Sequence, residues 1–307
     1  RKAFPRVPLL AVTATAPRKL ASDVARILLL DEGKVTFRCP SNRPNIVYSV
    51  QLKPSNETEA LGSILSWLGA RNLTHESGII YCFSRREADT LSESLNARGV
   101  RAGPYHAGCE EQFKESVHEA WLSGRISVVC ATVAFGLGID KPGVRFVAHF
   151  CLPKSIEAYY QESGRAGRDG KPAQAVLFFS PGDAVRMASL CHTDRAGVKP
   201  LRVMQRFAMG QGECRRTFLA RHLGDAKSDI DRIACRGSCD LCARNLNSNA
   251  PGGQAEDATA AALVVVQALR GVLDKGKKAT FKQLCDEAAK LGRKSVKEKK
   301  KHGGDND

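Results

Sequence analysis

Two stretches decide the fold and the contacts of this chain: Ala-Thr-Val-Ala-Phe-Gly-Leu-Gly-Ile-Asp at residues 131–140 and Gln-Glu-Ser-Gly-Arg-Ala-Gly-Arg-Asp-Gly at residues 161–170. Arg165 and Arg168 each follow a glycine. A guanidinium is a planar, permanently charged fork that matches phosphate oxygens, and the glycines permit a close backbone approach. On a helix, Gln161 would share a face with Arg165. The pattern indicates a polyphosphate contact; a solvated basic helix start is the plain alternative.

Around these stretches, apolar runs of strand length alternate with stretches of helical periodicity. Strands are expected at 7–12, 78–83, 100–105, 126–131, 144–150 and 173–179, helices at 17–29, 56–69, 85–97, 110–122 and 155–163, and short extended segments within 35–50. Such crossovers produce a parallel sheet with helices on both faces, an α/β fold. Ser84, His106, Thr132 and the Gly164 turn are expected in strand-end loops, where ligands of open sheets gather.

Cysteines are concentrated in the helical region after Pro181. Their spacing is C-x20-C-x3-C-x2-C, formed by Cys214, Cys235, Cys239 and Cys242. Four thiols with polar neighbours within thirty residues do not resemble core packing, and they can complete a tetrahedral shell around a structural zinc ion. His192 and His222 are spare candidates that we expect outside this shell.

Charge and composition restrict the partners. The formal net charge is +15, and residues 270–302 carry twelve Lys or Arg against four Asp or Glu, a net +8. This balance favours a polyanionic partner, nucleic acid above all. The run Lys297–Lys301 is typical of a solvated tail and is also compatible with a nuclear address. Eleven cysteines without a secretory leader favour a reducing compartment, and no apolar run is long enough to span a membrane.

Three further segments occur in a telling order: Ala-Val-Thr-Ala-Thr-Ala at 11–16, Ile-Ile-Tyr-Cys-Phe-Ser-Arg at 79–85 and Tyr-His-Ala-Gly at 105–108. With the two stretches quoted first and the cysteine set, they cover about residues 10–245. In these features the chain resembles the RecQ family of ATP-dependent DNA helicases. The three-residue spacing between Cys235 and Cys239 is similar to that of the short eukaryotic members, which favours a nuclear location.

The resemblance implies a domain order. It places the end of a first RecA-like motor lobe at 1–43, the second RecA-like lobe at 44–180, a small helical zinc-binding domain at 181–245, a linker at 246–256, and an incomplete winged helix with a basic tail at 257–307. The linker composition of 246–256 agrees with this division. Asn42-Arg43-Pro44-Asn45 matches a family segment at the lobe junction whose role is left unassigned.

The resemblance also implies the roles of site residues. Arg168 would reach the γ-phosphate of ATP across a cleft, with Arg165 beside it, and would stabilise the transferring phosphoryl group. Gln161, Gly138 and Asp140 would line the same nucleotide cleft; a tight strand-to-loop turn is the plain alternative for the last two. Ser84, Arg85, His106 and Thr132 would follow one DNA strand through its phosphates, although each alone could be structural.

A phosphate-binding loop of the form Gly-x4-Gly-Lys-Ser/Thr and an acidic Mg²⁺ motif are not found among these residues. Gly271-x4-Gly276-Lys277 comes close, but Lys278 replaces the hydroxyl residue. We therefore expect the motor to need a first lobe, and this chain alone to be inactive. The implied activity is 3′ to 5′ unwinding of duplex DNA from a single-stranded track, in repair or recombination. The alternatives are a non-catalytic nucleic-acid-binding scaffold and an RNA helicase; the cysteine set argues against the latter.

Overall fold

The computed structural model describes residues 7–13, 17–30, 35–133, 135, 139–191, 197–210, 212–247, 259–274, 283–284 and 287–291. The chain divides into two compact units, Arg1–Ala250 and Pro251–Asp307. The division falls within the segment whose composition is typical of a linker. Among the described residues, no helix has the length and apolar character needed to cross a membrane.

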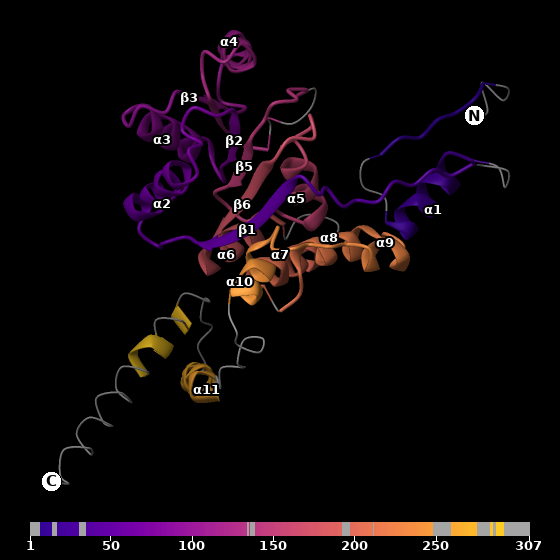
Figure 1. The fold of residues 1–307 in the computed structure, drawn as a ribbon. Helices are drawn as coiled ribbons and strands as arrows, with labels where there is room; N and C mark the ends of the chain where they lie inside the picture. The colour runs from indigo at the N-terminus through magenta and orange to yellow at the C-terminus, as the bar shows by residue number, and fades with distance from the viewer. Residues whose placement is uncertain are drawn as a thin grey trace, which may run out of the picture. The chain divides into compact units, whose positions relative to one another are not determined.

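A parallel sheet forms the centre of the first unit (Figure 1). Its six strands lie in the order β1-β6-β5-β2-β4-β3, and every pair is parallel. The strands are β1 (Ile46–Leu52), β2 (Gly78–Tyr81), β3 (Ala102–Tyr105), β4 (Val128–Ala131), β5 (Phe146–His149) and β6 (Ala173–Phe179). The α/β prediction is confirmed.

Helices cover both faces of this sheet, as expected. The helices of the described residues are α1 (Arg18–Ile27), α2 (Glu57–Ala70), α3 (Arg85–Asn96), α4 (Glu111–Leu122), α5 (Ile156–Ser163), α6 (Pro181–Cys191), α7 (Lys199–Met209), α8 (Arg215–Leu223), α9 (Lys227–Asp231) and α10 (Asp240–Asn247) in the first unit, and α11 (Thr259–Leu273) in the second unit. Buried residues of α2 and α3 join one core cluster, and those of α4, α5, α7 and α8 join the other.

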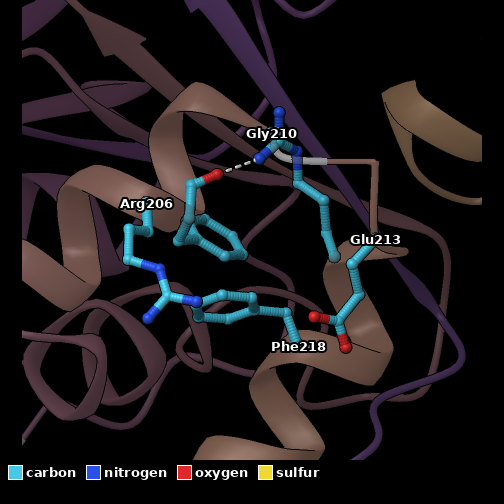
Figure 2. Close-up of a pocket in the computed structure, with 6 residues that line it drawn as sticks. Arg206, Gly210, Glu213 and Phe218 are labelled. Atoms are coloured by element: carbon cyan, nitrogen blue, oxygen red, sulfur yellow. Dashed lines mark hydrogen bonds between the residues drawn. The ribbon is translucent and has the colours of Figure 1, made fainter. Parts of the chain in front are cut away.

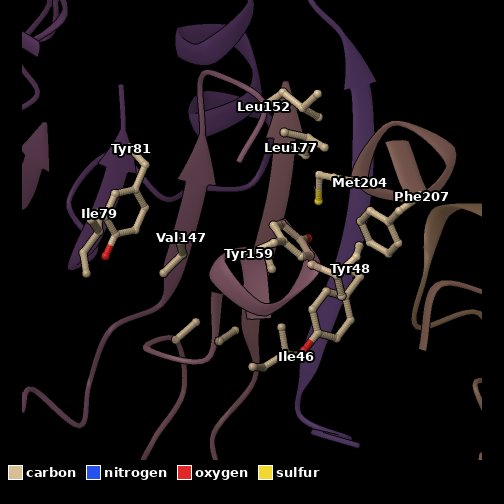
Figure 3. Close-up of a cluster of buried hydrophobic side chains, with 14 of the residues drawn as sticks. Ile46, Tyr48, Ile79, Tyr81, Val147, Leu152, Tyr159, Leu177, Met204 and Phe207 are labelled. Atoms are coloured by element: carbon tan, nitrogen blue, oxygen red, sulfur yellow. The ribbon is translucent and has the colours of Figure 1, made fainter. Parts of the chain in front are cut away.

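Alternation along the strands separates these two cores. Ile79 and Tyr81 of β2 belong to the cluster with α5, whereas Ile80 between them belongs to the cluster with α2 and α3. Successive strand side chains point to opposite faces, so a strand buried on both sides is apolar throughout. Figure 3 shows the α5 side, where Tyr159 lies between the sheet and Phe207 of α7.

N-cap side chains mark the first residues of several helices. Asn56 accepts hydrogen bonds from the backbone N–H groups of Thr58 and Glu59 at the start of α2, and Ser155 accepts one from Ala158 at the start of α5. These side chains satisfy donors that have no partner within the helix. The helix boundaries therefore fall close to the predicted ones.

The region after Pro181 packs against the edge strand β1. The backbone N–H of Tyr48 donates to the Ser238 carbonyl at 3.3 Å, and the N–H of Val50 donates to Asp240 Oδ2 at 3.1 Å. An edge strand otherwise presents unpaired backbone groups that invite association with other chains. The cysteine-rich region thus closes this edge of the sheet.

Two predictions near the beginning of the chain are wrong. Residues 7–13 form no strand, and residues 35–50 contain one regular strand rather than short pieces, because β1 begins at Ile46 and pairs with β6 along seven residues. The helix predicted after Pro17 is confirmed as α1. Of the region 257–307, where an incomplete winged helix is expected, the structure describes only residues 259–274, 283–284 and 287–291.

Candidate functional site

The four cysteines of the predicted metal set come together. All four Sγ atoms lie within 4.8 Å of one another, and those of Cys214 and Cys239 are 4.0 Å apart. A tetrahedral zinc with bonds of about 2.3 Å to sulfur separates its ligands by about 3.8 Å. The all-thiol donor set and its spacing therefore fit a closed, structural zinc site that these residues would hold.

Two elements supply the ligands. Cys214 directly precedes α8, Cys235 and Cys239 lie in the turn that leads into α10, and Cys242 lies in the first turn of α10. The Cys239 thiol donates to Cys214 Sγ, which lowers the pKa of Cys214. His222 pairs with Glu157 instead, its Nε2 lying 2.9 Å from Oε1. His192 lies outside the described residues.

A buried ion pair supports the metal turn. Arg215 Nε lies 2.6 Å from Asp240 Oδ1, and its Nη2 lies 2.9 Å from Oδ2. The Arg215 side chain is 3% exposed and that of Asp240 14% exposed. This two-bond fork joins the residue after Cys214 to the residue after Cys239, so it fixes the two halves of the metal set relative to each other.

The arginine stretch forms a loop between α5 and β6. Arg168 Nη1 donates to the Ile139 carbonyl and to Asp140 Oδ1, both at 2.8 Å. Arg168 and Asp140 are both exposed, with 36% and 81% of their side-chain surface accessible. An exposed pair of this kind is worth less than about 1 kcal/mol. Arg168 can therefore exchange Asp140 for another anion at little cost.

Arg165 lies deeper, beside Tyr81 of β2. Burial raises the pKa of Tyr81, and the nearby Arg165, which hydrogen-bonds to the hydroxyl, opposes that rise. The Tyr81 hydroxyl donates to the Phe135 carbonyl at 3.0 Å. Arg165 Nε is buried and has no hydrogen-bond partner within the described part of the chain. The structure thus brings together the arginine loop and the segment after β4.

The position of the arginine loop corrects one expectation, since the Gly164 turn does not lie at the carboxyl ends of the strands. The N–H of Gly167 donates to the Val144 carbonyl at 2.8 Å, and that of Asp169 donates to the Pro142 carbonyl at 3.4 Å. Pro142 and Val144 precede β5. Because α5 runs antiparallel to the strands it connects, its end lies at their amino ends, opposite to Ser84.

The other residues predicted to line the nucleotide cleft differ in what the structure shows of them. Asp140 contacts Arg168 as described, and Gln161 lies exposed on the last turn of α5. Gly138 lies outside the described residues. The loop itself requires Gly167, whose φ is +57° and where an added Cβ would lie 2.5 Å from Asn45 Nδ2. This glycine allows close packing of the loop on the segment before β1.

Ser84 and Arg85 lie at the carboxyl end of β2. Ser84 Oγ accepts the N–H of Glu87 at 3.1 Å and begins α3. Glu87 Oε2 accepts the N–H of Phe83 at 2.9 Å, and Arg186 of α6 binds its other oxygen at 2.7 Å. Arg85 is exposed. The Ser84 cap therefore fixes the start of α3, so that the exposed guanidinium of Arg85 lies at the carboxyl end of β2.

His106 and Thr132 lie at the carboxyl ends of the neighbouring strands β3 and β4. His106 is 6% exposed; its Nε2 lies 2.9 Å from Asp89 Oδ1, and its Nδ1 accepts the N–H of Gly108 at 3.2 Å. The ring therefore shapes the turn that carries Gly108, next to the Arg85 side chain. Thr132 is partly exposed. The sheet order places the three strand ends side by side.

The region after Pro181 also contains a pocket that the sequence did not predict (Figure 2). Its walls are Arg206, Phe207, Gly210, Glu213, Arg215 and Phe218. Arg215 donates to the Phe207 carbonyl and is neutralised by Asp240, and Glu213 pairs with Arg221 at 2.8 Å. The charges in and beside this pocket are thus largely matched within the chain.

Sequence reasoning did not assign three residues that contact the site. Arg43 and Asn45 hydrogen-bond to backbone carbonyls of the arginine loop. Arg216 of α8 is 4% exposed and bonds to the segment that carries them. The Asn-Arg-Pro-Asn segment was noticed, but its partners lie more than 120 positions away, and no local pattern identifies them.

Comparison with known proteins agrees with this geometry. The family model "Helicase conserved C-terminal domain" matches residues 57–170, and "RecQ zinc-binding" matches 181–243. The chain is 41% identical over 277 residues to the putative ATP-dependent DNA helicase Q1 of Caenorhabditis briggsae, covering 90% of this chain and 44% of that protein. It is 40% identical over 248 residues to the ATP-dependent DNA helicase Q1 of Mus musculus, covering 80% and 37%.

Among solved structures, Saccharomyces cerevisiae Dbp5 bound to RNA and ADP BeF3 matches with a TM-score of 0.48 and 20% identity, over 59% of this chain and 47% of that one. The family models identify the parallel sheet as a helicase C-terminal domain and the four-cysteine region as a RecQ zinc-binding domain. The chain belongs to the RecQ family of DNA helicases. It spans less than half the length of the two relatives described above.

Proposed function

We propose that this chain is the second motor lobe and zinc-binding region of an ATP-dependent DNA helicase that moves 3′ to 5′ along single-stranded DNA. In this proposal a first lobe supplies the phosphate-binding loop and the Mg²⁺ ligands, and residues 1–43 are the end of that lobe. Unwinding of duplex DNA in repair or recombination, and a nuclear location, belong to the same proposal. The names of the relatives and the net charge of +15 support it.

One observation carries the proposal: the connection from β4 to β5 links the carboxyl ends of the strands to their amino ends. Residues 132 and 133 lie at the carboxyl end of β4, beside the predicted DNA residues, and residues 139–145 lead into the amino end of β5, beside the arginine loop. At one end lies Thr132, and at the other Asp140 contacts Arg168. Such a connection gives DNA contact and nucleotide contact a shared mechanical element, which a motor requires.

At the nucleotide edge the chain contributes positive charge. ATP, when bound between lobes, supplies the phosphoryl group that is transferred. Arg168 would leave Asp140 and stabilise the charge that develops on that group, an effect typically worth about a thousandfold or more in rate. Arg165, which hydrogen-bonds to Tyr81, would keep the segment after β4 in place beside the arginine loop. Gln161, Gly138 and Asp140 would line the cleft.

At the opposite edge, Ser84, Arg85, His106 and Thr132 would hold one DNA strand. Arg85 and the hydroxyl of Thr132 would contact phosphates directly, which gives sequence-tolerant binding. Ser84 and His106 already have protein partners, so their contribution would be to shape the Arg85 and Gly108 loops. Closure of the two lobes on ATP would then displace this strand.

The test is DNA-stimulated ATPase activity in a protein that joins this chain to a first lobe with a phosphate-binding loop. Arg168→Ala should leave ATP affinity nearly unchanged and lower kcat about a thousandfold. Arg168→Lys should recover little of the loss, because an ammonium group cannot reproduce the planar fork. Arg98→Ala, on an exposed turn that follows α3, is the matched control and should have full activity.

The 307-residue chain itself should bind nucleotide weakly and hydrolyse none. Robust turnover by this chain, or an Arg168→Ala protein as fast as its parent, would overturn the division of roles between lobes. Absence of any ATPase activity in the two-lobe protein, with DNA binding retained, would instead identify a non-catalytic nucleic-acid-binding module.

A further inference from the structure

The Asn-Arg-Pro-Asn segment at residues 42–45 contacts the arginine loop through its side chains. Arg43 Nη1 donates to the Gly164 carbonyl at 3.2 Å, and its Nη2 donates to the carbonyls of Ala166 and Gly167 at 3.2 and 2.9 Å. These carbonyls follow α5, where helix carbonyls lack intrahelical partners and the macrodipole favours a cation. One guanidinium therefore holds the backbone on both sides of Arg165.

Asn45 continues this contact toward β6. Its Nδ2 donates to the carbonyls of Gly167 and Lys171 at 2.8 and 2.9 Å. Gly167 thus accepts hydrogen bonds from Arg43 and Asn45 together, while its own N–H bonds to Val144. The loop segment that carries Arg168 is fixed at both ends by residues 42–45.

The segment is in turn fixed by the zinc-binding region. Buried Arg216 donates to Asn42 Oδ1 at 3.0 Å and to the carbonyls of Arg43, Pro44 and Ile46 at 2.6, 3.1 and 2.5 Å. Asp225 Oδ2 accepts the N–H and the hydroxyl of Ser41, each at 2.8 Å. Arg216 lies two residues after the metal-set residue Cys214.

We infer that Arg43 and Asn45 are positioning residues for the arginine loop, and that Arg216 makes the position of these two residues depend on the folding of the zinc-binding region. Nucleotide turnover would thereby depend on the folded state of the zinc-binding region. This inference rests on the proposed function for its catalytic consequence, and on the described contacts for the clamp itself.

Hydrogen exchange of the zinc-loaded 307-residue chain tests the clamp without any activity. In Arg43→Ala, amides of the peptide 164–172 should exchange on the order of tenfold faster, because three charge-assisted hydrogen bonds are lost. Arg216→Lys should accelerate the same peptide although it does not touch it. Arg221→Ala, an exposed arginine of the same helix, is the control and should change nothing there. Zinc content is measured for each variant.

ATPase kinetics in the two-lobe protein test the consequence. Arg43→Ala should lower kcat on the order of tenfold to a hundredfold, since small displacements of a catalytic group are costly, with KM for ATP nearly unchanged. Arg43→Lys should recover only part, because one ammonium cannot reach three carbonyls.

Each outcome separates the two claims. Unchanged exchange at 164–172 in a zinc-loaded Arg43→Ala chain would overturn the clamp. Faster exchange with an unchanged kcat would overturn its positioning role. If Arg43→Ala accelerates exchange but the two-lobe parent has no ATPase activity, the clamp stands. The proposed function then fails, and with it the catalytic part of this inference.

Discussion

Asp240→Asn is the substitution whose effect can be worked out most fully from the structure. The Asp240 carboxylate accepts two bonds from Arg215, one from the Val50 N–H and one from the Leu241 N–H. An amide of the same shape loses the negative charge and presents a donor where a donor already lies. Arg215, with 3% of its side chain exposed, is then left buried without a counter-charge.

Breaking a buried pair by removing one partner costs about 3–5 kcal/mol. Asn keeps one acceptor oxygen, so the lower value of about 3 kcal/mol is expected here. For a folded unit of this size, 1 kcal/mol changes Tm by about 2–4 °C, so Tm should fall by about 6–12 °C. Since Asp240 follows Cys239, release of zinc to a chelator should also become faster.

The assay is thermal unfolding of the zinc-loaded chain, with zinc release followed by a chromogenic chelator. Asp229→Asn is the control, because its pair with Arg232 spans 4.0 Å and that arginine is 82% exposed; its effect should stay within about 0.5 kcal/mol. Combining Arg215→Met with Asp240→Asn removes both charges, and should cost at least about 1 kcal/mol less than the two single effects added together. A Tm within a degree of the parent for Asp240→Asn, or strict additivity, would refute this reasoning.

Three further predictions concern the metal, the nucleic acid and acid stability. Elemental analysis should find about one zinc per chain, and Cys239→Ser should lose it; full metal content in that variant would contradict the site. Single-stranded DNA should bind with an affinity whose logarithm falls linearly with log salt, and Arg85→Ala, unlike Arg98→Ala, should weaken binding similarly for all sequences; salt-independent binding would be incompatible with phosphate contacts. The hydrogen bond from His222 lowers the pKa of Glu157 to about 2, so the pair stabilises the fold above the usual glutamate pKa of about 4.3 and this contribution is lost as the pH falls toward 2. Glu157→Gln should therefore destabilise the chain by less than about 1 kcal/mol near neutral pH, with a difference from the parent that shrinks in acid; a difference that grows in acid would reverse the sign argued here.

Much of the architecture could be predicted because it depends on local patterns. Strands such as β2 and β4 are apolar on both faces, and side chains such as Asn56 and Ser155 mark helix starts. The strand predicted at 7–12 was wrong because an apolar run of six residues does not by itself determine a partner strand. The metal set was predictable because three closely spaced thiols and a fourth one within thirty residues match the ligand pattern of a structural zinc site.

The sequence by itself therefore determined the α/β class, the four-cysteine set and the arginine pair, since each is visible as a pattern of residue types along the chain. Only the tertiary structure decided where these features lie. It placed the arginine loop at the amino ends of the strands, because α5 must run back across the sheet. It buried His106 beneath a turn, and it brought Arg43, Asn45 and Arg216 to carbonyls far away in the chain. Such contacts depend on where the packing of helices and strands places the ends of these elements, and no local propensity specifies those positions.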